Sequence, residues 1–148
     1  MDAFVQPLYE LADFDAIIRQ LKKPGIVQVS GCLDSQKAHF TNGLLREFPF
    51  RLIVAENDLK AKAFYEDFRL YDPEVLYYPA RDLIFYQADI HGNLLTRQRI
   101  QVLRALLERE EVTIVTSIDS CLDCLVPLAV WKEKVIKIRN DSEIDLDR

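Results

Sequence analysis

The sequence predicts an α/β domain in which helices cover both faces of a parallel sheet. Short apolar runs of strand length alternate with longer segments of helical periodicity. The apolar runs also lack the polar alternation of a strand with one solvated face. Strands that alternate with helices form right-handed βαβ units, so the strands lie parallel. The 148 residues suffice for one domain with a substantial core.

Apolar runs bounded by turn residues define the predicted strands. Pro24 and Gly25 precede the first of them, and Asp72 and Pro73 form a turn before the third. The predicted strands are residues 26–30 (IVQVS), 51–55 (RLIVA), 75–78 (VLYY) and 112–116 (VTIVT).

Helical periodicity and capping residues define the helices between these strands. Pro49 ends one helix, and Asn57 or Asp58 caps the next. The predicted helices are residues 13–23, 35–48, 57 or 58 to 71, 94–110, and 117 or 119 to about 125. Residues 79–93 are expected to form a loop between the third strand and its following helix.

The pattern changes after Pro127, where an amphipathic strand (VWKEKVIKIRN) is followed by a helix start. We therefore expect a helical lead-in at 1–24, the α/β domain at 25–126, and the start of a second, truncated domain at 127–148. The chain is expected to be a piece of a longer protein.

Composition excludes several classes of protein. The net charge of −5 and the pI near 5.1 oppose tight non-specific binding of nucleic acid, which needs a basic face. No apolar run reaches the roughly 20 residues of a membrane span, and the N-terminus lacks a signal-peptide layout. Three cysteines give no disulfide framework. A cytoplasmic protein is expected.

The stretch SGCLDSQKAHF, residues 30–40, has the frame of a phosphate-binding loop. Gly31 and Lys37 occupy the first glycine and the lysine of G-x-x-x-x-G-K-[ST], between a predicted strand and a predicted helix. Gln36 replaces the second glycine, where the backbone must approach the phosphates closely. Ala38 replaces the Ser or Thr and has no oxygen for magnesium.

Asp34 and Ser35 further oppose a working nucleotide site. Asp34 places a carboxylate at the helix N-terminus, where the charge of a phosphate would lie. Either residue can cap the free N–H groups of the helix. We therefore interpret the loop as a degenerate phosphate loop, formed by Gly31, Asp34, Ser35, Gln36, Lys37 and Ala38.

Three segments carry a family resemblance, namely GCLDSQKAHF, RLIVAENDLKAKAFYEDFRLYDPEVLYYPARD and RQRIQVLRALLEREEVTIVTSIDSCLDCLVP. In their order and spacing, over about residues 25–148, they resemble the N-terminal region of bacterial transcription-repair coupling factors (the Mfd family). That region is itself similar to the UvrB-type damage-binding helicases of nucleotide excision repair.

The resemblance implies a RecA-like, UvrB-like domain with a degenerate nucleotide site. It also implies that ATP and Mg²⁺ act in a motor far downstream, and that RNA polymerase and DNA are held by downstream segments. UvrA would be recruited through the adjoining second domain, which only begins near Pro127. The loop at 79–93 is too short for the aromatic hairpin of UvrB-type proteins, which favours the coupling factor.

An aromatic and basic cluster is the candidate for nucleic-acid contact, since single-strand binders stack bases on aromatic rings. Packing of these aromatics at a strand end is the favoured alternative, given the acidic total. Arg97 and Arg104 share a helix face that reads as solvated, with a phosphate contact as the alternative. The candidates are Tyr78, Arg81, Tyr86, Arg97 and Arg104, with Tyr77 and Phe85 beside them.

Cysteine and histidine give no catalytic or metal pattern. Cys121 and Cys124 are spaced C-L-D-C, but only Cys32, His39 and His91 remain as further ligands, so we expect two small buried side chains. Metal or redox use is the alternative.

The sequence thus predicts a non-catalytic scaffolding and regulatory piece without its own cofactor. Its parent would displace stalled RNA polymerase at lesions and recruit excision-repair proteins. The alternatives are an active UvrB-type ATPase or helicase domain, which Gln36 and Ala38 oppose, and a small single-strand binder.

Overall fold

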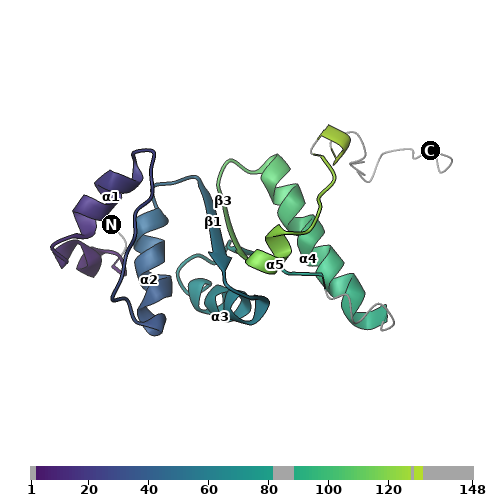
Figure 1. The fold of residues 1–148 in the computed structure, drawn as a ribbon, viewed down its shortest axis with the longest axis horizontal. Helices are drawn as coiled ribbons and strands as arrows, with labels where there is room; N and C mark the ends of the chain where they lie inside the picture. Colours follow the sequence, from purple (N-terminus) through teal and green to yellow (C-terminus); the bar gives the residue numbers. More distant parts are fainter. Residues whose placement is uncertain (1–2, 82–88, 128, 132–148) are drawn as a thin grey trace.

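A parallel sheet forms the centre of the molecule (Figure 1). The structure, a computed structural model, describes residues 3–81, 89–127 and 129–131. Within these residues the sheet has three strands in the order β1-β3-β2. They are β1 (Phe50–Ala55), β2 (Leu76–Tyr78) and β3 (Val112–Ser117), and β3 pairs in parallel with both neighbours. The α/β class and three of the predicted strands are confirmed.

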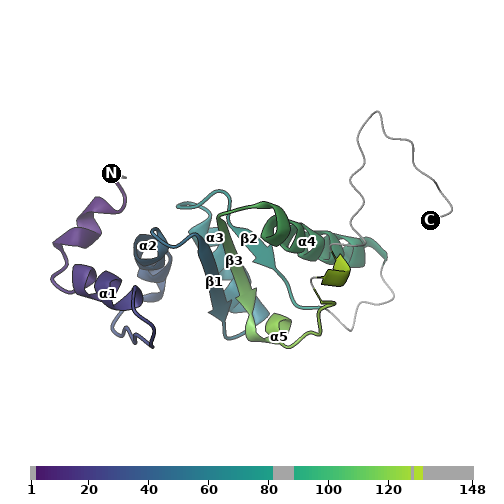
Figure 2. The ribbon, with the colours of Figure 1, turned by 90° about the horizontal axis from the view of Figure 1, so that it is seen from above.

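Helices cover the two faces of this sheet (Figure 2). On one face, α3 (Asp58–Phe68) buries Ala61 and Phe68 against Tyr77 and Val115. On the other, α4 (Asp89–Glu108) buries Val102 and Ala105 against sheet residues that include Val112 and Ile114. All six residues of β3 are buried, as expected for a central strand covered on both sides.

The predicted strand at residues 26–30 is wrong. These residues form no strand, and the side chains of Ile26 and Val29 are 99% and 42% exposed. An apolar run becomes a strand only where a neighbouring strand takes its backbone hydrogen bonds. None of the strands in the described part of the chain does so here.

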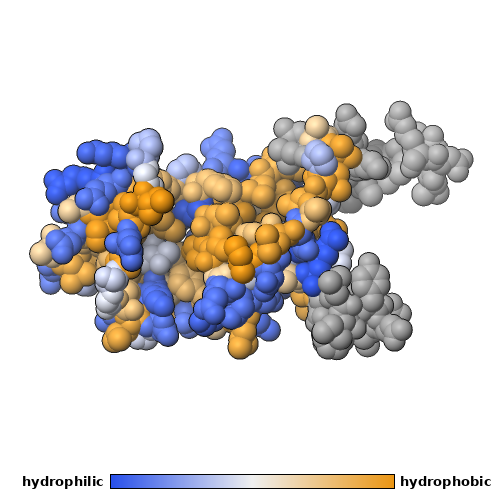
Figure 3. Space-filling model, viewed as in Figure 1, coloured by the Kyte–Doolittle hydropathy of each residue, from blue (hydrophilic) through white to orange (hydrophobic). Residues whose placement is uncertain are grey.

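Strand β1 lies at the edge of the sheet and is covered on one face only. Phe50, Leu52 and Val54 are 56%, 52% and 46% exposed, while Ile53 packs toward α3. Apolar side chains gather in the middle of the molecule in Figure 3, where β1 and β3 lie in Figure 1.

The N-terminal segments form a small separate core against α2 (Asp34–Leu45). A 3₁₀ helix, η1 (Gln6–Glu10), and helix α1 (Phe14–Leu21) pack on Phe40 and Leu44 of α2. The buried residues on their side are Val5, Leu8, Phe14 and Ile18. Figure 1 shows this unit at the opposite end of the molecule from α4.

Several predicted helix boundaries differ from the structure: the helices predicted at 35–48 and to residue 71 end three residues early, at Leu45 and Phe68. Helix α4 begins at Asp89, so the last part of the expected loop at 79–93 is helical. Helix α5 (Ile118–Cys121) ends four residues before the predicted end near residue 125. The predicted second domain lies almost entirely outside the described residues. None of the described helices has both the length and the apolar character needed to cross a bilayer.

Candidate functional site

The loop at Gly31 is closed by its own side chains. Gly31 has φ +86°, a left-handed conformation that favours glycine, so a turn alone explains this residue. The side chain of Gln36 folds back, and its Oε1 accepts a hydrogen bond from the N–H of Leu33 at 3.3 Å. Gln36 thus occupies a donor at the start of α2 that a bound anion would otherwise use.

Lys37 is paired within the same turn. Its Nζ lies 2.5 Å from Oδ1 of Asp34, three residues earlier on the exposed side of α2. This hydrogen bond and the opposite charge lower the pKa of the Asp34 carboxyl and raise the pKa of Lys37. The ammonium group that would reach a phosphate therefore already has a carboxylate partner. The side chain of Ser35 is exposed beside them.

Ala38 points away from the loop. It is 3% exposed and belongs to the core cluster that contains Ala61, Phe68 and Val115. In a working phosphate loop the Ser or Thr at this position presents a hydroxyl to magnesium. A hydroxyl at residue 38 would instead enter the core between α2 and α3.

The lead-in to the loop also differs from a phosphate loop. Such a loop connects the end of a strand to a helix, which fixes its backbone amides around the phosphates. Residues 26–30 lie outside the sheet, so the strand end is missing here. Of the predicted strand, loop and helix, only the loop and the helix are present.

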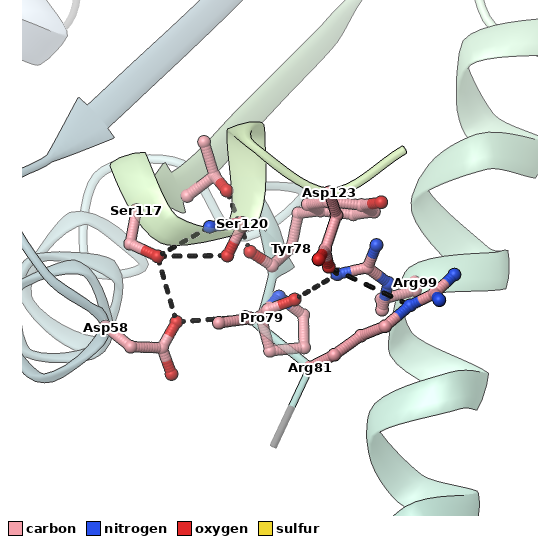
Figure 4. Close-up of polar contacts among 10 residues, drawn as sticks. Asp58, Tyr78, Pro79, Arg81, Arg99, Ser117, Ser120 and Asp123 are labelled. Atoms are coloured by element: carbon pink, nitrogen blue, oxygen red, sulfur yellow. Dashed lines mark hydrogen bonds and ion pairs between the residues drawn. The ribbon is translucent and has the colours of Figure 1, made fainter. Parts of the chain in front are cut away.

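The carboxyl edge of the sheet, where ligands of α/β proteins usually bind, carries a polar cluster (Figure 4). Asp58, at the start of α3, accepts hydrogen bonds at Oδ1 from the N–H of Ala80 at 3.1 Å and from Oγ of Ser117 at 3.3 Å. Ser117 also caps α5 and lies 2.9 Å from Oγ of Ser120. The cluster therefore ties together the segments that follow β1, β2 and β3.

A buried arginine forms the other half of this edge. Arg99 of α4 is 6% exposed, and its guanidinium lies 4.2 Å from the ring centroid of Tyr78. Nη1 of Arg99 donates to the carbonyl oxygen of Pro79 at 2.8 Å and lies 2.9 Å from a carboxylate oxygen of Asp123 (Figure 4). Burial raises the pKa of the Tyr78 hydroxyl, and the charge of Arg99 opposes that rise.

These contacts indicate that the residues at this edge have a structural role. Ser117 is fully buried, and its hydroxyl bonds to Asp58 and Ser120; within the described part of the chain, no histidine or lysine bonds to it as an activating base. Asp58, Arg99 and Asp123 likewise contact groups of the chain itself. The cluster is well suited to hold strand ends and helices in place.

The candidates for nucleic-acid contact are not brought together. Tyr78 is buried and Arg99 lies over one face of its ring, so the ring is not exposed for stacking on a base. Arg81 is exposed and lies 3.8 Å from Asp123, and Arg104 pairs with Glu108 at 2.9 Å. Arg97 is exposed on α4, and Tyr86 lies outside the described residues.

The cysteines and histidines occupy separate places. Cys121 and Cys124 are free and exposed, so the expectation of two buried side chains is wrong. His39 stacks on Tyr71 at 5.3 Å and contacts the carbonyl oxygen of Phe4. The side chain of His91 lies outside the described residues. In the part of the chain that the structure describes, no three His, Cys, Asp or Glu residues form a metal-ligand group.

Comparison with known proteins finds one distant likeness. Over 124 residues, 82% of this chain, it is 25% identical to transcription-repair-coupling factors from two strains of Staphylococcus epidermidis. The chain spans 11% of the length of these curated relatives. No family model matches the sequence. No solved structure matches it either. This similarity points to the same family as the resemblance of the three sequence segments. At 25% identity it does not show that the chain belongs to that family.

The sequence patterns single out Asp58 and Ser117 only as helix caps, and they do not single out Arg99, Ser120 or Asp123. A signal for Arg99 is present, because it lies three residues before Val102 and six before Ala105, on the buried stripe of α4. A charged residue on that stripe indicates a buried ion pair. Asp123 has no such signal, since it follows a short helix in an irregular segment.

Proposed function

We propose that this chain is a non-catalytic, scaffolding and regulatory domain of a transcription-repair coupling factor type of protein. The likeness to those factors over 124 residues supports the family side of the proposal. The α/β architecture, with helices flanking a parallel sheet, is compatible with a RecA-like domain. The degenerate phosphate loop supports the non-catalytic side.

The single observation that carries the proposal is the occupation of the phosphate loop by the chain's own groups. Asp34 pairs with Lys37, Gln36 bonds the N–H of Leu33, and Ala38 is buried in the core. Each of these opposes one of the three devices by which such a loop holds a nucleotide: the lysine, the amide cradle and the metal-ligating hydroxyl, in that order. The same features oppose the alternative of an active ATPase domain.

In this proposal the longer protein displaces stalled RNA polymerase at DNA lesions and brings in excision-repair proteins. ATP and Mg²⁺ serve its downstream motor, and RNA polymerase and DNA bind its downstream segments. UvrA binds through the domain that adjoins residue 127. This chain contributes a folded platform, and we propose that it packs against the motor and restrains it.

A deletion in the longer protein tests this role. Removal of the module should change the rates of ATP hydrolysis and DNA translocation, because a regulatory contact with the motor is lost. Lys37→Ala in the intact protein is the matched control and should leave both rates unchanged, since the loop holds no nucleotide. Unchanged rates after the deletion would contradict a regulatory role, and a loss of ATP hydrolysis with Lys37→Ala would restore the loop as a nucleotide site.

A further inference from the structure

Two thiols lie exposed on one short turn at the carboxyl edge of the sheet. Cys121 is the last residue of α5, and Cys124 follows three residues later. Both are free and exposed, whereas Cys32, before α2, is half-buried. Neither the fold nor the proposed function uses this pair. Reactivity of thiols depends on access, so their exposure calls for a chemical interpretation.

The backbone around the pair is compatible with a bond between the two sulfurs. The N–H of Leu122 donates to Ile118 at 3.2 Å, and the N–H of Asp123 donates to Ser120 at 3.4 Å, so the chain keeps turning past the end of α5. Residues three apart on such a turn have Cβ atoms about 5–6 Å apart. A disulfide needs about 3.5–4.5 Å. Cys124 lies beyond the helical turn, so helical hydrogen bonds do not fix the two cysteines at that separation.

The pair brackets a residue that holds the fold together. Asp123 lies between the two cysteines, and its carboxylate pairs with the buried Arg99. Arg99 in turn holds the carbonyl oxygen of Pro79 at the end of β2. A bond between Cys121 and Cys124 would restrict the turn that carries Asp123. It would thereby affect the ion pair of Asp123 with Arg99, which joins α4 to this edge.

We propose that Cys121 and Cys124 form a reversible intrachain disulfide when the chain meets a hydroperoxide. One thiolate attacks a peroxide oxygen, the O–O bond breaks, and the sulfur becomes a sulfenic acid while water or an alcohol leaves. The second thiolate attacks that sulfur, the S–S bond forms, and the sulfenic oxygen leaves as water. The two thiols give up two electrons and two protons, and the peroxide is reduced. A small-molecule dithiol reverses the bond by exchange.

Intact-mass analysis of the full chain tests this proposal. Treatment with a small excess of hydrogen peroxide should remove two hydrogens from the monomer and leave one of the three thiols titratable. Dithiothreitol should restore all three. Cys32→Ser should still lose two hydrogens, whereas Cys121→Ser and Cys124→Ser should not. Each of the three variants lacks one thiol, so all three start with the same number of thiols.

Three results would overturn the proposal. These are retention of all three thiols, gain of oxygen atoms without loss of hydrogens, and covalent dimers in place of the intrachain bond. Hydrogen exchange gives a second readout, because the turn around Asp123 should become more protected in the oxidised chain and not in oxidised Cys124→Ser. Equal exchange in the two would contradict the proposed effect on this turn.

Discussion

Arg99 and Asp123 form an ion pair, 2.9 Å between Nη1 and a carboxylate oxygen, that joins helix α4 to the turn after α5. The arginine side chain is 8% exposed and the aspartate side chain 27%, so the pair is largely removed from water. Removing one partner of such a pair is costly because the other charge stays buried without compensation.

Arg99→Met should therefore destabilise the chain by about 3 kcal/mol. The substitution keeps an unbranched apolar stem but removes the guanidinium and with it the contacts to Asp123 and to the carbonyl oxygen of Pro79. Denaturant unfolding measures the change. Arg104→Met, on the exposed side of the same helix, is the control and should cost less than about 1 kcal/mol. Equal losses of stability in the two variants would mean that the buried ion pair stabilises the fold no more than the exposed one.

Ala38→Thr should destabilise the chain by about 1–3 kcal/mol, because the position is in the core and a hydroxyl there finds no room and no water. Ala63→Thr on the exposed side of α3 is matched in helix propensity and should cost less than about 1 kcal/mol. Thermal unfolding of both variants gives the comparison. A neutral Ala38→Thr would show that residue 38 can turn its side chain toward the loop.

Phe14→Ala should cost about 3–5 kcal/mol if the N-terminal unit unfolds with the sheet. The ring is 1% exposed and makes edge contacts with Tyr9 and Phe40 at 5.1 and 5.6 Å. Leu11→Ala, at a half-exposed position, should have little effect. Separate melting of the N-terminal segments in hydrogen exchange, with the sheet unaffected, would show instead that this small core is an independent unit.

As pH rises into the alkaline range, the chain should unfold at a lower pH than a variant in which Tyr77 and Tyr78 are replaced. Burial is the main reason why the pKa of each of these tyrosines is raised from the ordinary value near 10. Above about pH 10 the unfolded chain loses these protons and the folded chain keeps them. The free energy of unfolding therefore falls as pH rises, by up to about 1.4 kcal/mol per pH unit for each tyrosine.

Tyr77→Phe/Tyr78→Phe should flatten this fall between pH 10 and 12, as followed by urea unfolding at several pH values. A slope that stays the same in the double variant would show that other groups govern alkaline unfolding.

Sequence patterns predicted the elements whose packing is complete within the described residues. The strand at 112–116 is buried on both faces, the strand at 51–55 pairs with it and packs Ile53 toward α3, and the structure places both within one residue of the prediction. Residues 26–30 have the same apolar character, but no strand among the described residues pairs with them, and Ile26 and Val29 stay exposed there. Propensity and periodicity cannot tell these two situations apart.

The two parts of the candidate site, the loop at Gly31 and the carboxyl edge of the sheet, also differ in how far the sequence predicts them. The loop at Gly31 was predicted only in part: Gln36 and Ala38 can be read from the sequence, but the expected cap by Asp34 or Ser35 is wrong, because Leu33 is the N-cap and Asp34 pairs with Lys37 instead. The carboxyl edge could not be predicted, because Asp58, Arg99 and Asp123 meet only when the sheet order brings their elements together. Cys121 lies within α5 as predicted and is exposed nonetheless, whereas Cys124 lies past the early end of α5, a boundary that sequence patterns place poorly.

Calorimetric titration of the chain with Mg-ATP and Mg-ADP tests the central claim, that the loop at Gly31 holds no nucleotide. We expect no binding heat at micromolar to millimolar nucleotide, in the native chain and in Gln36→Gly/Ala38→Thr alike, because the strand that leads into a phosphate loop is missing. Saturable micromolar binding by the native chain, lost in Lys37→Ala, would contradict a degenerate loop and make Lys37 a phosphate ligand.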